Sequence, residues 1–259
     1  MFASQTMRAR QALDRLVHPV RLEEFRASPE QVKGALNGRG GTVADAFFAQ
    51  TDRGVHKWGH YLPAYERQFG QYVGQPVRFL EIGVFYGGSL EMWRRYLGPQ
   101  ATIFGIDVDP RSRVADSQDH PVRVGSQADA AFLRSVVDEM GGIDVVLDDG
   151  SHKADDQRVS FETLFPLLAD GGLYSVEDLH TSYWRRHYRG GYRRRGTFIE
   201  VAKDLVDGMH AWYYKRPAPR LGRIAKTEIE SVCFYDSMVF IAKRHHGQPI
   251  VTRVGKPSW

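Results

Sequence analysis

The sequence is poor in cysteine and in long apolar runs. Its 259 residues include a single cysteine, Cys233, which cannot form an internal disulfide and has no cysteine neighbours for a zinc cluster. The longest apolar runs, such as IDVVL and MVFIA, are far shorter than the roughly 20 residues needed to cross a bilayer. The N-terminus also lacks the compact apolar segment of a signal peptide. We therefore expect a cytoplasmic protein that neither spans a membrane nor is secreted.

The net charge is also small, with 35 lysines and arginines against 31 aspartates and glutamates. This mild excess does not by itself indicate binding to nucleic acid. Six arginines nevertheless fall within residues 185–196, RRHYRGGYRRRG, among tyrosines and three glycines. This segment could be a basic binding loop or a solvated lid. We expect residues 180–196 to form a mobile loop rich in arginine, glycine and tyrosine.

Strand-like and helix-like patterns alternate from residue 77 onward. The expected strands are residues 77–84, 101–109, 121–125, 142–149 and 171–178, and the expected helices between them are residues 87–97, 129–140 and 158–172. This alternation predicts an α/β fold: a doubly wound, Rossmann-like, mostly parallel sheet with helices on both faces. A helix at residues 197–213 follows. Two strands within residues 225–244, joined by a tight YDS turn, then predict an antiparallel hairpin at the sheet edge.

The N-terminal part of the chain is expected to be helical. Residues 7–17 and 29–36 space their apolar side chains three and four positions apart among charges, and a further helix is expected at residues 63–69. We divide the chain into a helical N-terminal extension, residues 1–45, and one α/β domain, residues 46–259.

Two strand ends predict a cofactor site, because ligands of open parallel sheets bind at the carboxyl ends of the strands. Gly83, Gly87 and Gly88 allow a tight turn that a cofactor can approach, although they could form only a close-packed turn. Asp107 follows Gly83 by 24 positions (107 − 83), close to the interval of about 20 that precedes a ribose-binding carboxylate. The missing GxGxxG pattern and Walker lysine disfavour NAD and ATP. Glu81 favours a cofactor with ammonium and sulfonium groups.

Acidic residues end the fourth and fifth strands. Asp149, Glu177 and Asp178 would converge there, and three such carboxylates are unfavourable together unless a cation neutralises them. Oxygen ligands without cysteine favour a hard ion, best Mg²⁺. Alternatively, Asp149 caps a helix and the other two are solvated. His152 could take a proton from a hydroxyl near the metal, or could be a turn histidine bonded to the backbone.

Four motifs together resemble a known family: FLEIGVFYGGSLEMW, IFGIDVDP, DVVLDDGSH and GGLYSVEDLHTSYW. They are similar to class I S-adenosylmethionine-dependent methyltransferases, and more narrowly to the metal-dependent sugar O-methyltransferases of macrolide tailoring. The resemblance covers most of the chain, and the DDGSH and VEDLHTSYW pair is its most specific part. It implies that Asp149, Glu177 and Asp178 bind Mg²⁺ and that His152 is the catalytic base. The cofactor-binding residues that we expect are Glu81, Gly83, Gly87, Asp107, Ser126, Gln127 and Asp148.

The function implied is a Mg²⁺-dependent transfer of a methyl group from S-adenosylmethionine to a hydroxyl of a small molecule. The acceptor class that fits best is a sugar of a secondary metabolite such as an antibiotic. We expect a homo-oligomer without membrane or nucleic-acid partners. Two alternatives stay open: an NAD-binding oxidoreductase, which would share the sheet and the ribose carboxylate, and an RNA-binding or RNA-modifying methyltransferase that uses the arginine-rich loop.

Overall fold

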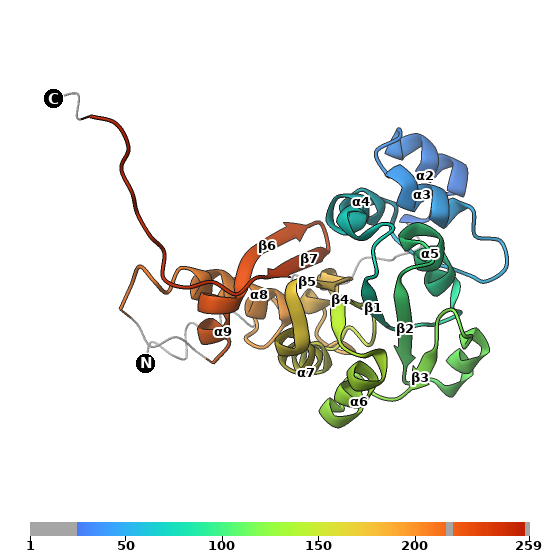
Figure 1. Cartoon of the computed structure of the whole chain (residues 1–259). Helices are drawn as coiled ribbons and strands as arrows, with labels where there is room; N and C mark the ends of the chain where they lie inside the picture. Colours follow the sequence, from blue (N-terminus) through green and yellow to red (C-terminus); the bar gives the residue numbers. More distant parts are fainter. Residues whose placement is uncertain (1–24, 216–219, 257–259) are drawn as a thin grey trace.

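The computed structural model describes residues 25–215 and 220–256 (Figure 1). The helices are α2 (Pro29–Leu36), α3 (Gly41–Phe48), α4 (Leu62–Phe69), α5 (Gly88–Leu97), α6 (Ala130–Met140), α7 (Ala154–Leu164), α8 (Phe198–Met209) and α9 (Arg220–Glu228). The strands are β1 (Arg78–Ile82), β2 (Thr102–Asp107), β3 (Val122–Val124), β4 (Ile143–Asp148), β5 (Leu168–Val176), β6 (Ile229–Tyr235) and β7 (Met238–Lys243). The helix expected at residues 7–17 lies outside the described residues.

The strands form one sheet in the order β3-β2-β1-β4-β5-β7-β6. Strands β1 to β5 run parallel, whereas β7 pairs antiparallel with β5 and with β6. The predicted parallel sheet with a C-terminal antiparallel hairpin is therefore confirmed. The strand order reverses between β1 and β4, which places a ligand crevice at the carboxyl ends of these two strands.

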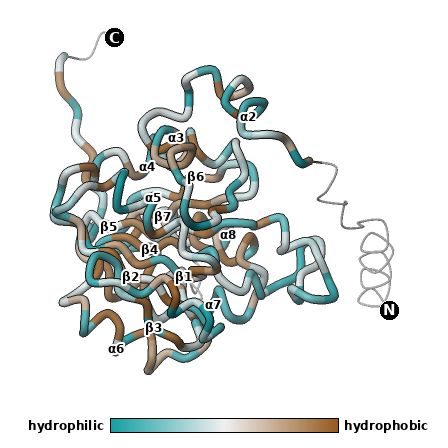
Figure 2. The backbone as a smooth tube through the Cα atoms, turned by 90° about the vertical axis from the view of Figure 1, so that its right-hand side faces the viewer, coloured by the Kyte–Doolittle hydropathy of each residue, from teal (hydrophilic) through white to brown (hydrophobic). Residues whose placement is uncertain are grey.

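Helices cover both faces of the sheet (Figure 1). Side chains of α3, α4 and α5 join one hydrophobic cluster, and those of α6, α7 and α8 join another. Successive residues of a strand point to opposite faces, so Phe79 of β1 packs into the first cluster and its neighbour Leu80 into the second. In Figure 2 the strands form the hydrophobic interior of the molecule. Within the described ranges, no helix combines the length and apolar character that crossing a membrane requires.

The N-terminal helices pack onto the first of these clusters. A capping box begins α2, in which the Ser28 and Gln31 side chains each bond to the other's backbone. Val43 of α3 is fully buried in the same cluster as Phe79. The division of the chain at residue 46 stays a prediction, and α3 spans that position.

The helix expected at residues 158–172 was placed wrongly. Helix α7 begins four residues earlier, at Ala154, and ends at Leu164, and residues from Leu168 onward belong to β5. Pro166 explains the end of the helix, because it has no backbone N–H to donate to the carbonyl four residues earlier, and the chain continues only as a short 3-10 turn, Phe165–Leu167. The apolar run FPLLA could not be assigned to helix or strand from its periodicity alone.

Two further segments differ from expectation. Residues 225–228 were expected to open the final hairpin, but they complete α9, and β6 begins at Ile229. The helix expected at residues 197–213 ends at Met209, directly after Gly208, a residue that weakens helices.

The close approach of β1 and β4 can be tested at Gly83. This residue has φ of 96°, and a Cβ atom there would lie 2.1 Å from the carbonyl oxygen of Asp149. Gly74 provides a matched control, because its φ is 71° but a Cβ atom would meet open space. Alanine is strained at either position, whereas only Gly83→Ala also forces main chains apart. We expect Gly83→Ala to lower the free energy of unfolding by about 2 kcal/mol more than Gly74→Ala does, in urea titrations. Equal losses would contradict the close approach.

Candidate functional site

The acidic strand ends are divided between the two faces of the sheet. Parallel register places Ile82 beside Asp148, and Asp148 beside Val176. Because side chains alternate along a strand, Asp148 points to the same face as Val146, toward α6 to α8. The next residue, Asp149, and its counterpart Glu177 reach the opposite side, where α4 and α5 lie. The two adjacent aspartates therefore enter different environments.

A buried lysine connects the carboxylates on the α4–α5 side. The Nζ atom of Lys57 lies 2.6 Å from Oδ2 of Asp149, and 3.0 and 3.1 Å from the two carboxylate oxygens of Glu177. Oε1 of Glu81 lies 3.7 Å from the same nitrogen. The Lys57 side chain is only 2% exposed. Burial alone would lower the pKa of Lys57, but the three carboxylates outweigh it and raise that pKa, so the ammonium stays charged.

Two tyrosines of the α4 region hold the acidic pair that follows β5. The Tyr65 hydroxyl donates a short hydrogen bond to Glu177, and the Tyr61 hydroxyl donates one of 2.7 Å to Oδ1 of Asp178. Burial, together with the neighbouring carboxylates, raises the pKa of both tyrosines. Burial and then the charge of Asp149 raise the pKa of Glu177, although Lys57 opposes them. Both tyrosines therefore act as donors.

Sequence reasoning missed Lys57, Tyr61 and Tyr65. The available signal was the spacing of four residues between Tyr61 and Tyr65, which favours one side of a helical segment, whereas Lys57 precedes that segment and offered no such signal. Nothing in that spacing identifies the carboxylates they contact, which lie about a hundred positions further along the chain.

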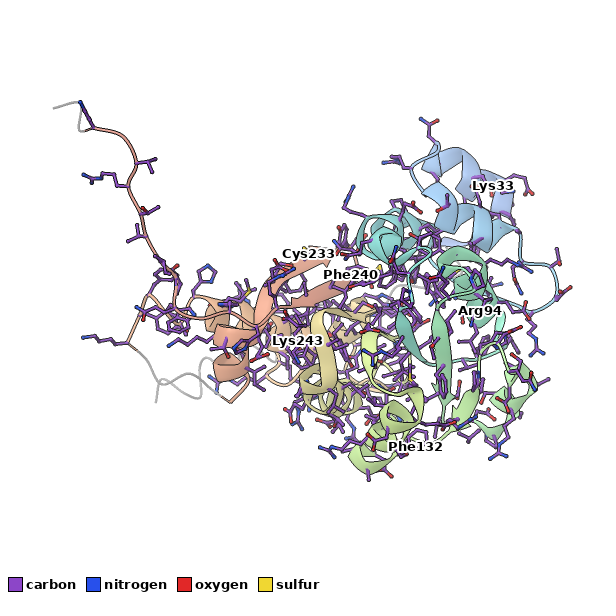
Figure 3. The ribbon with its side chains drawn as sticks, viewed as in Figure 1. Lys33, Arg94, Phe132, Cys233, Phe240 and Lys243 are labelled. Carbon is purple, nitrogen blue, oxygen red and sulfur yellow. The ribbon has the colours of Figure 1, made fainter. Side chains whose placement is uncertain are left out.

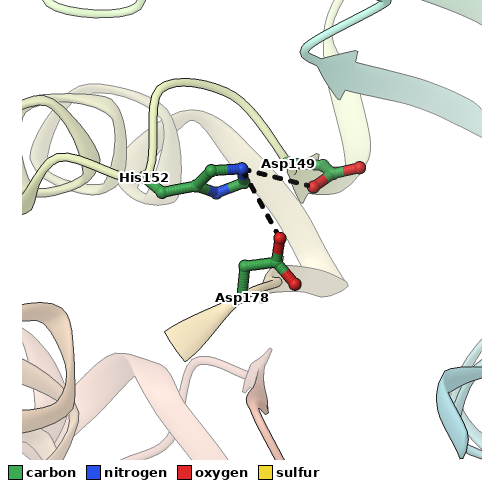
Figure 4. Close-up of side chains that lie close together, drawn as sticks. All are labelled: Asp149, His152 and Asp178. Atoms are coloured by element: carbon green, nitrogen blue, oxygen red, sulfur yellow. Dashed lines mark ion pairs between the residues drawn. The ribbon is translucent and has the colours of Figure 1, made fainter. Parts of the chain in front are cut away.

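The structure brings one ring nitrogen of His152 toward two of the predicted metal ligands (Figure 4). Its Nε2 atom lies 3.9 Å from Oδ1 of Asp149 and 3.6 Å from Oδ2 of Asp178. One ligand atom from each of these three residues lies within 4.8 Å of the others, so the group could hold a metal ion. His152 and Asp178 have φ of 55° and 53°, left-handed conformations that are costly for such residues and that often occur at functional sites.

Two cavities lie over the carboxyl ends of the strands. The larger, of about 610 Å³, is lined by Lys57, Gly83, Asp107, Asp149, His152, Glu177 and Asp178, among others. The smaller, of about 230 Å³, includes Ser126 and Gln127 in its lining. Gly83, Asp107 and Gly150 border both cavities. An elongated ligand could therefore extend from one into the other across Gly83.

Asp107 also orders the glycine turn between the cavities. Its Oδ2 atom accepts hydrogen bonds of 2.9 Å from the backbone N–H groups of both Val84 and Phe85. Gly87 has φ of 86° and precedes α5, and a Cβ atom there would lie 2.3 Å from the Ala115 Cβ. These contacts fix the turn that was predicted to approach the cofactor.

Two predicted cofactor residues lie deeper than the cavity walls. Asp148 is fully buried and accepts hydrogen bonds from Gln127 (3.1 Å) and Tyr174 (3.2 Å). Glu81 is also fully buried and accepts hydrogen bonds from Ser89 and Trp93. Burial raises the pKa of Asp148 to about 6 and that of Glu81 to about 7. Their carboxylates therefore lie beneath the cavity walls, where they are held by hydrogen bonds from neighbouring side chains.

The arginine-rich loop lies beside His152. The Tyr188 ring centroid is 6.2 Å from that of His152, and the Tyr188 carbonyl accepts a hydrogen bond from the N–H of Ala154. Arg189 forms an exposed 2.8 Å ion pair with Asp155 at the start of α7. The loop is thus connected to the site, and its mobility stays a prediction.

Comparison with known proteins agrees with the fold. Residues 80–179 match a family described as a methyltransferase domain. The chain is 38% identical over 201 residues to the 8-demethyl-8-(2-methoxy-alpha-L-rhamnosyl)-tetracenomycin-C 3'-O-methyltransferase of Streptomyces olivaceus, covering 74% of this chain and 51% of that protein. It is 33% identical over 210 residues to the mycinamicin VI 2''-O-methyltransferase of Micromonospora griseorubida, covering 77% and 50%.

A solved structure shows the same likeness. The MycE methyltransferase of the mycinamycin biosynthetic pathway, in complex with Mg, SAH and mycinamycin VI, has a TM-score of 0.69 and 30% identity to this chain. The match covers 85% of this chain and 56% of that one. The chain therefore spans about half the length of the relatives that it matches.

The buried Asp148 gives a prediction about pH. Its pKa of about 6 exceeds the ordinary 3.8, so the folded protein binds this proton more tightly than the unfolded chain does. The stability it contributes is therefore complete below about pH 4 and is lost as pH rises to about 6, by roughly 3 kcal/mol. Asp148→Asn removes this titration, and we expect a correspondingly flatter fall in the free energy of unfolding, measured in urea across this range.

The matched control is Asp144→Asn. Arg78 hydrogen bonds outweigh burial at Asp144 and lower its pKa. The stability from this pair is present above the ordinary pKa and lost only below it, so Asp144→Asn should keep the wild-type slope between about pH 4 and 6 and change the pH dependence only at lower pH. A wild-type slope in Asp148→Asn would contradict the prediction.

Proposed function

The chain carries a class I methyltransferase domain like that of antibiotic sugar O-methyltransferases, and we propose that it transfers a methyl group from S-adenosylmethionine to a sugar hydroxyl of a secondary metabolite. One observation carries the proposal. The glycine turn ordered by Asp107 and the cluster of Asp149, His152 and Asp178 border the same cavity. A cofactor and an ionisable acceptor can thus meet there.

The proposed cofactor position follows the two cavities. The methionine end would lie in the larger cavity by Gly83, with Glu81 behind it, and the ribose by Asp107. The adenine would lie in the smaller cavity by Ser126 and Gln127, which line it. When bound, S-adenosylmethionine supplies a methyl group activated by its sulfonium. The absence of a side chain at Gly83 lets the turn that borders both cavities lie against the backbone of Asp149.

The proposed metal ligands are Asp149, Glu177 and Asp178. Their oxygen donors suit a hard divalent ion such as Mg²⁺ or Mn²⁺. Asp149 and Glu177 share the single ammonium of Lys57, so with Asp178 the cluster holds more carboxylates than that one charge can balance. When bound, the ion supplies a positive charge that lowers the pKa of a neighbouring acceptor hydroxyl.

His152 is the proposed base. Its Nε2 atom would accept the hydroxyl proton while the acceptor oxygen takes the methyl group and the carbon–sulfur bond breaks. Asp149 and Asp178 lie close enough to this nitrogen to stabilise the imidazolium that forms. Trp58, which lines the cavity, and Tyr188, which lies beside His152, would help to exclude water from the acceptor.

Other expectations rest on the sequence and the family resemblance. A homo-oligomeric assembly and a cytoplasmic location are proposed on those grounds. The NAD and RNA alternatives receive no support from the relatives, which are named as sugar O-methyltransferases.

Cofactor and metal binding test the proposal directly. We expect isothermal titration to show binding of S-adenosylmethionine and S-adenosylhomocysteine but not of NAD, together with a separate Mg²⁺ signal. Asp149→Ala should lose the Mg²⁺ signal because it removes a carboxylate ligand, while adenosyl-ligand affinity stays largely unchanged. Asp155→Ala, which removes an exposed acid nearby, is the control and should keep both signals. Failure of both adenosyl ligands to bind would refute the proposed activity.

The role of His152 needs a kinetic test. Without its proton acceptor, His152→Ala should lower turnover by roughly 10²-fold or more, with cofactor affinity retained. The assay follows labelled methyl transfer to 8-demethyl-8-alpha-L-rhamnosyl tetracenomycin-C, the compound in one relative's name, and its dependence on pH. His180→Ala is the control, since His180 bonds to Ser237 and should cause a smaller loss. Turnover of His152→Ala equal to wild type would eliminate the base role.

A further inference from the structure

Lys57 places a fixed positive charge inside the proposed metal cluster. Its ammonium contacts both oxygens of Glu177 and Oδ2 of Asp149, within 3.1 Å in each case. The other oxygen of Asp149, Oδ1, is the one that faces His152. Lys57 therefore binds two of the three carboxylates proposed to hold the metal ion.

Burial strengthens the interaction of the Lys57 ammonium with the surrounding carboxylates. The side chains of Lys57 and Glu177 are each only 2% exposed, so water screens their interaction weakly. Glu81, fully buried, lies on the same ammonium at 3.7 Å. Three carboxylates from the ends of β1, β4 and β5 would repel one another strongly if this charge were removed.

A divalent ion on these carboxylates would experience the same ammonium as a repulsive charge. Magnesium ligands lie at about 2.0–2.1 Å, so an ion bound to Glu177 or Asp149 would stand only a few ångströms from Nζ of Lys57. Metal affinity rises with the negative charge of the ligand set, and Lys57 reduces that charge by one. The lysine and the ion therefore act on the same carboxylates with opposing effects.

We propose that Lys57 is an internal counter-cation that holds the carboxylate cluster together in the metal-free protein and lowers its affinity for the divalent ion. This positioning role rests on the proposed function, because it assumes that the cluster binds a metal. It differs from a purely structural role, in which the loss of Lys57 would destabilise the protein without strengthening its metal binding.

Lys57→Met tests the proposal, since methionine keeps much of the side-chain volume without the charge. In the full chain, we expect a lower Tm in EDTA and an Mg²⁺ Kd tighter by roughly tenfold or more in isothermal titration. The rise in Tm on adding Mg²⁺ should consequently exceed that of wild type.

Lys243→Met is the matched control. Lys243 is also buried, at the end of β7 (Figure 3), but its ammonium bonds to the backbone carbonyls of Phe165, Pro166 and Leu168. Its replacement should lower Tm while leaving the Mg²⁺ Kd and the Mg²⁺-induced rise in Tm as in wild type.

The outcomes separate this proposal from the proposed function. If wild type binds Mg²⁺ and Lys57→Met binds it with the same or weaker affinity, the proposed role of Lys57 is refuted and the proposed function is not. If wild type binds no Mg²⁺, the metal site and this proposal are both refuted. The titration of wild type is enough to detect this outcome. If Lys57→Met folds in neither condition, Lys57→Gln in the same titration decides, with the same expected and contradicting results.

Discussion

Carboxylates buried at the end of a parallel sheet need a cation, and this requirement governs the arrangement of the site. The register of β1, β4 and β5 brings Glu81, Asp149 and Glu177 to one side of the sheet. Without a cation their repulsion would favour separation of the strand ends. Lys57 supplies that charge from the segment before α4, so the packing of that segment and the electrostatics of the strand ends depend on each other.

The same strand geometry gives neighbouring acids different environments. Asp149 faces the cation, whereas Asp148 turns to the opposite face, where Gln127 and Tyr174 donate hydrogen bonds to it. The chain then enters left-handed conformations at His152 and Asp178, which aim an imidazole and a carboxylate at a common point. Backbone strain at these two positions falls on residues of the candidate site, while regular strands carry the supporting contacts.

Much of the fold and part of the site followed from the sequence. Alternating strand and helix patterns identified the sheet, and the rule that ligands bind at strand carboxyl ends brought Asp149 and Asp178 together. Period-two alternation would also have separated Asp148 from Asp149, had it been applied to the strand end. Lys57 could not be placed in this way, because its contacts are long-range and depend on how α4 packs against the sheet. The apolar run FPLLA misled the assignment of α7 and β5, because its pattern fits either structure, and Pro166 was the signal that the helix ends there.

The site combines rigid strand ends with a separate covering segment. Groups that perform chemistry need fixed positions, and β1, β4 and β5 provide them through continuous parallel pairing. Residues 54–58 line the same cavity but belong to a connecting segment before α4. Lys57 joins the two parts, because its backbone lies in the covering segment and its ammonium among the strand-end carboxylates. Any change in the charge of the cluster therefore acts directly on the segment that lines the cavity.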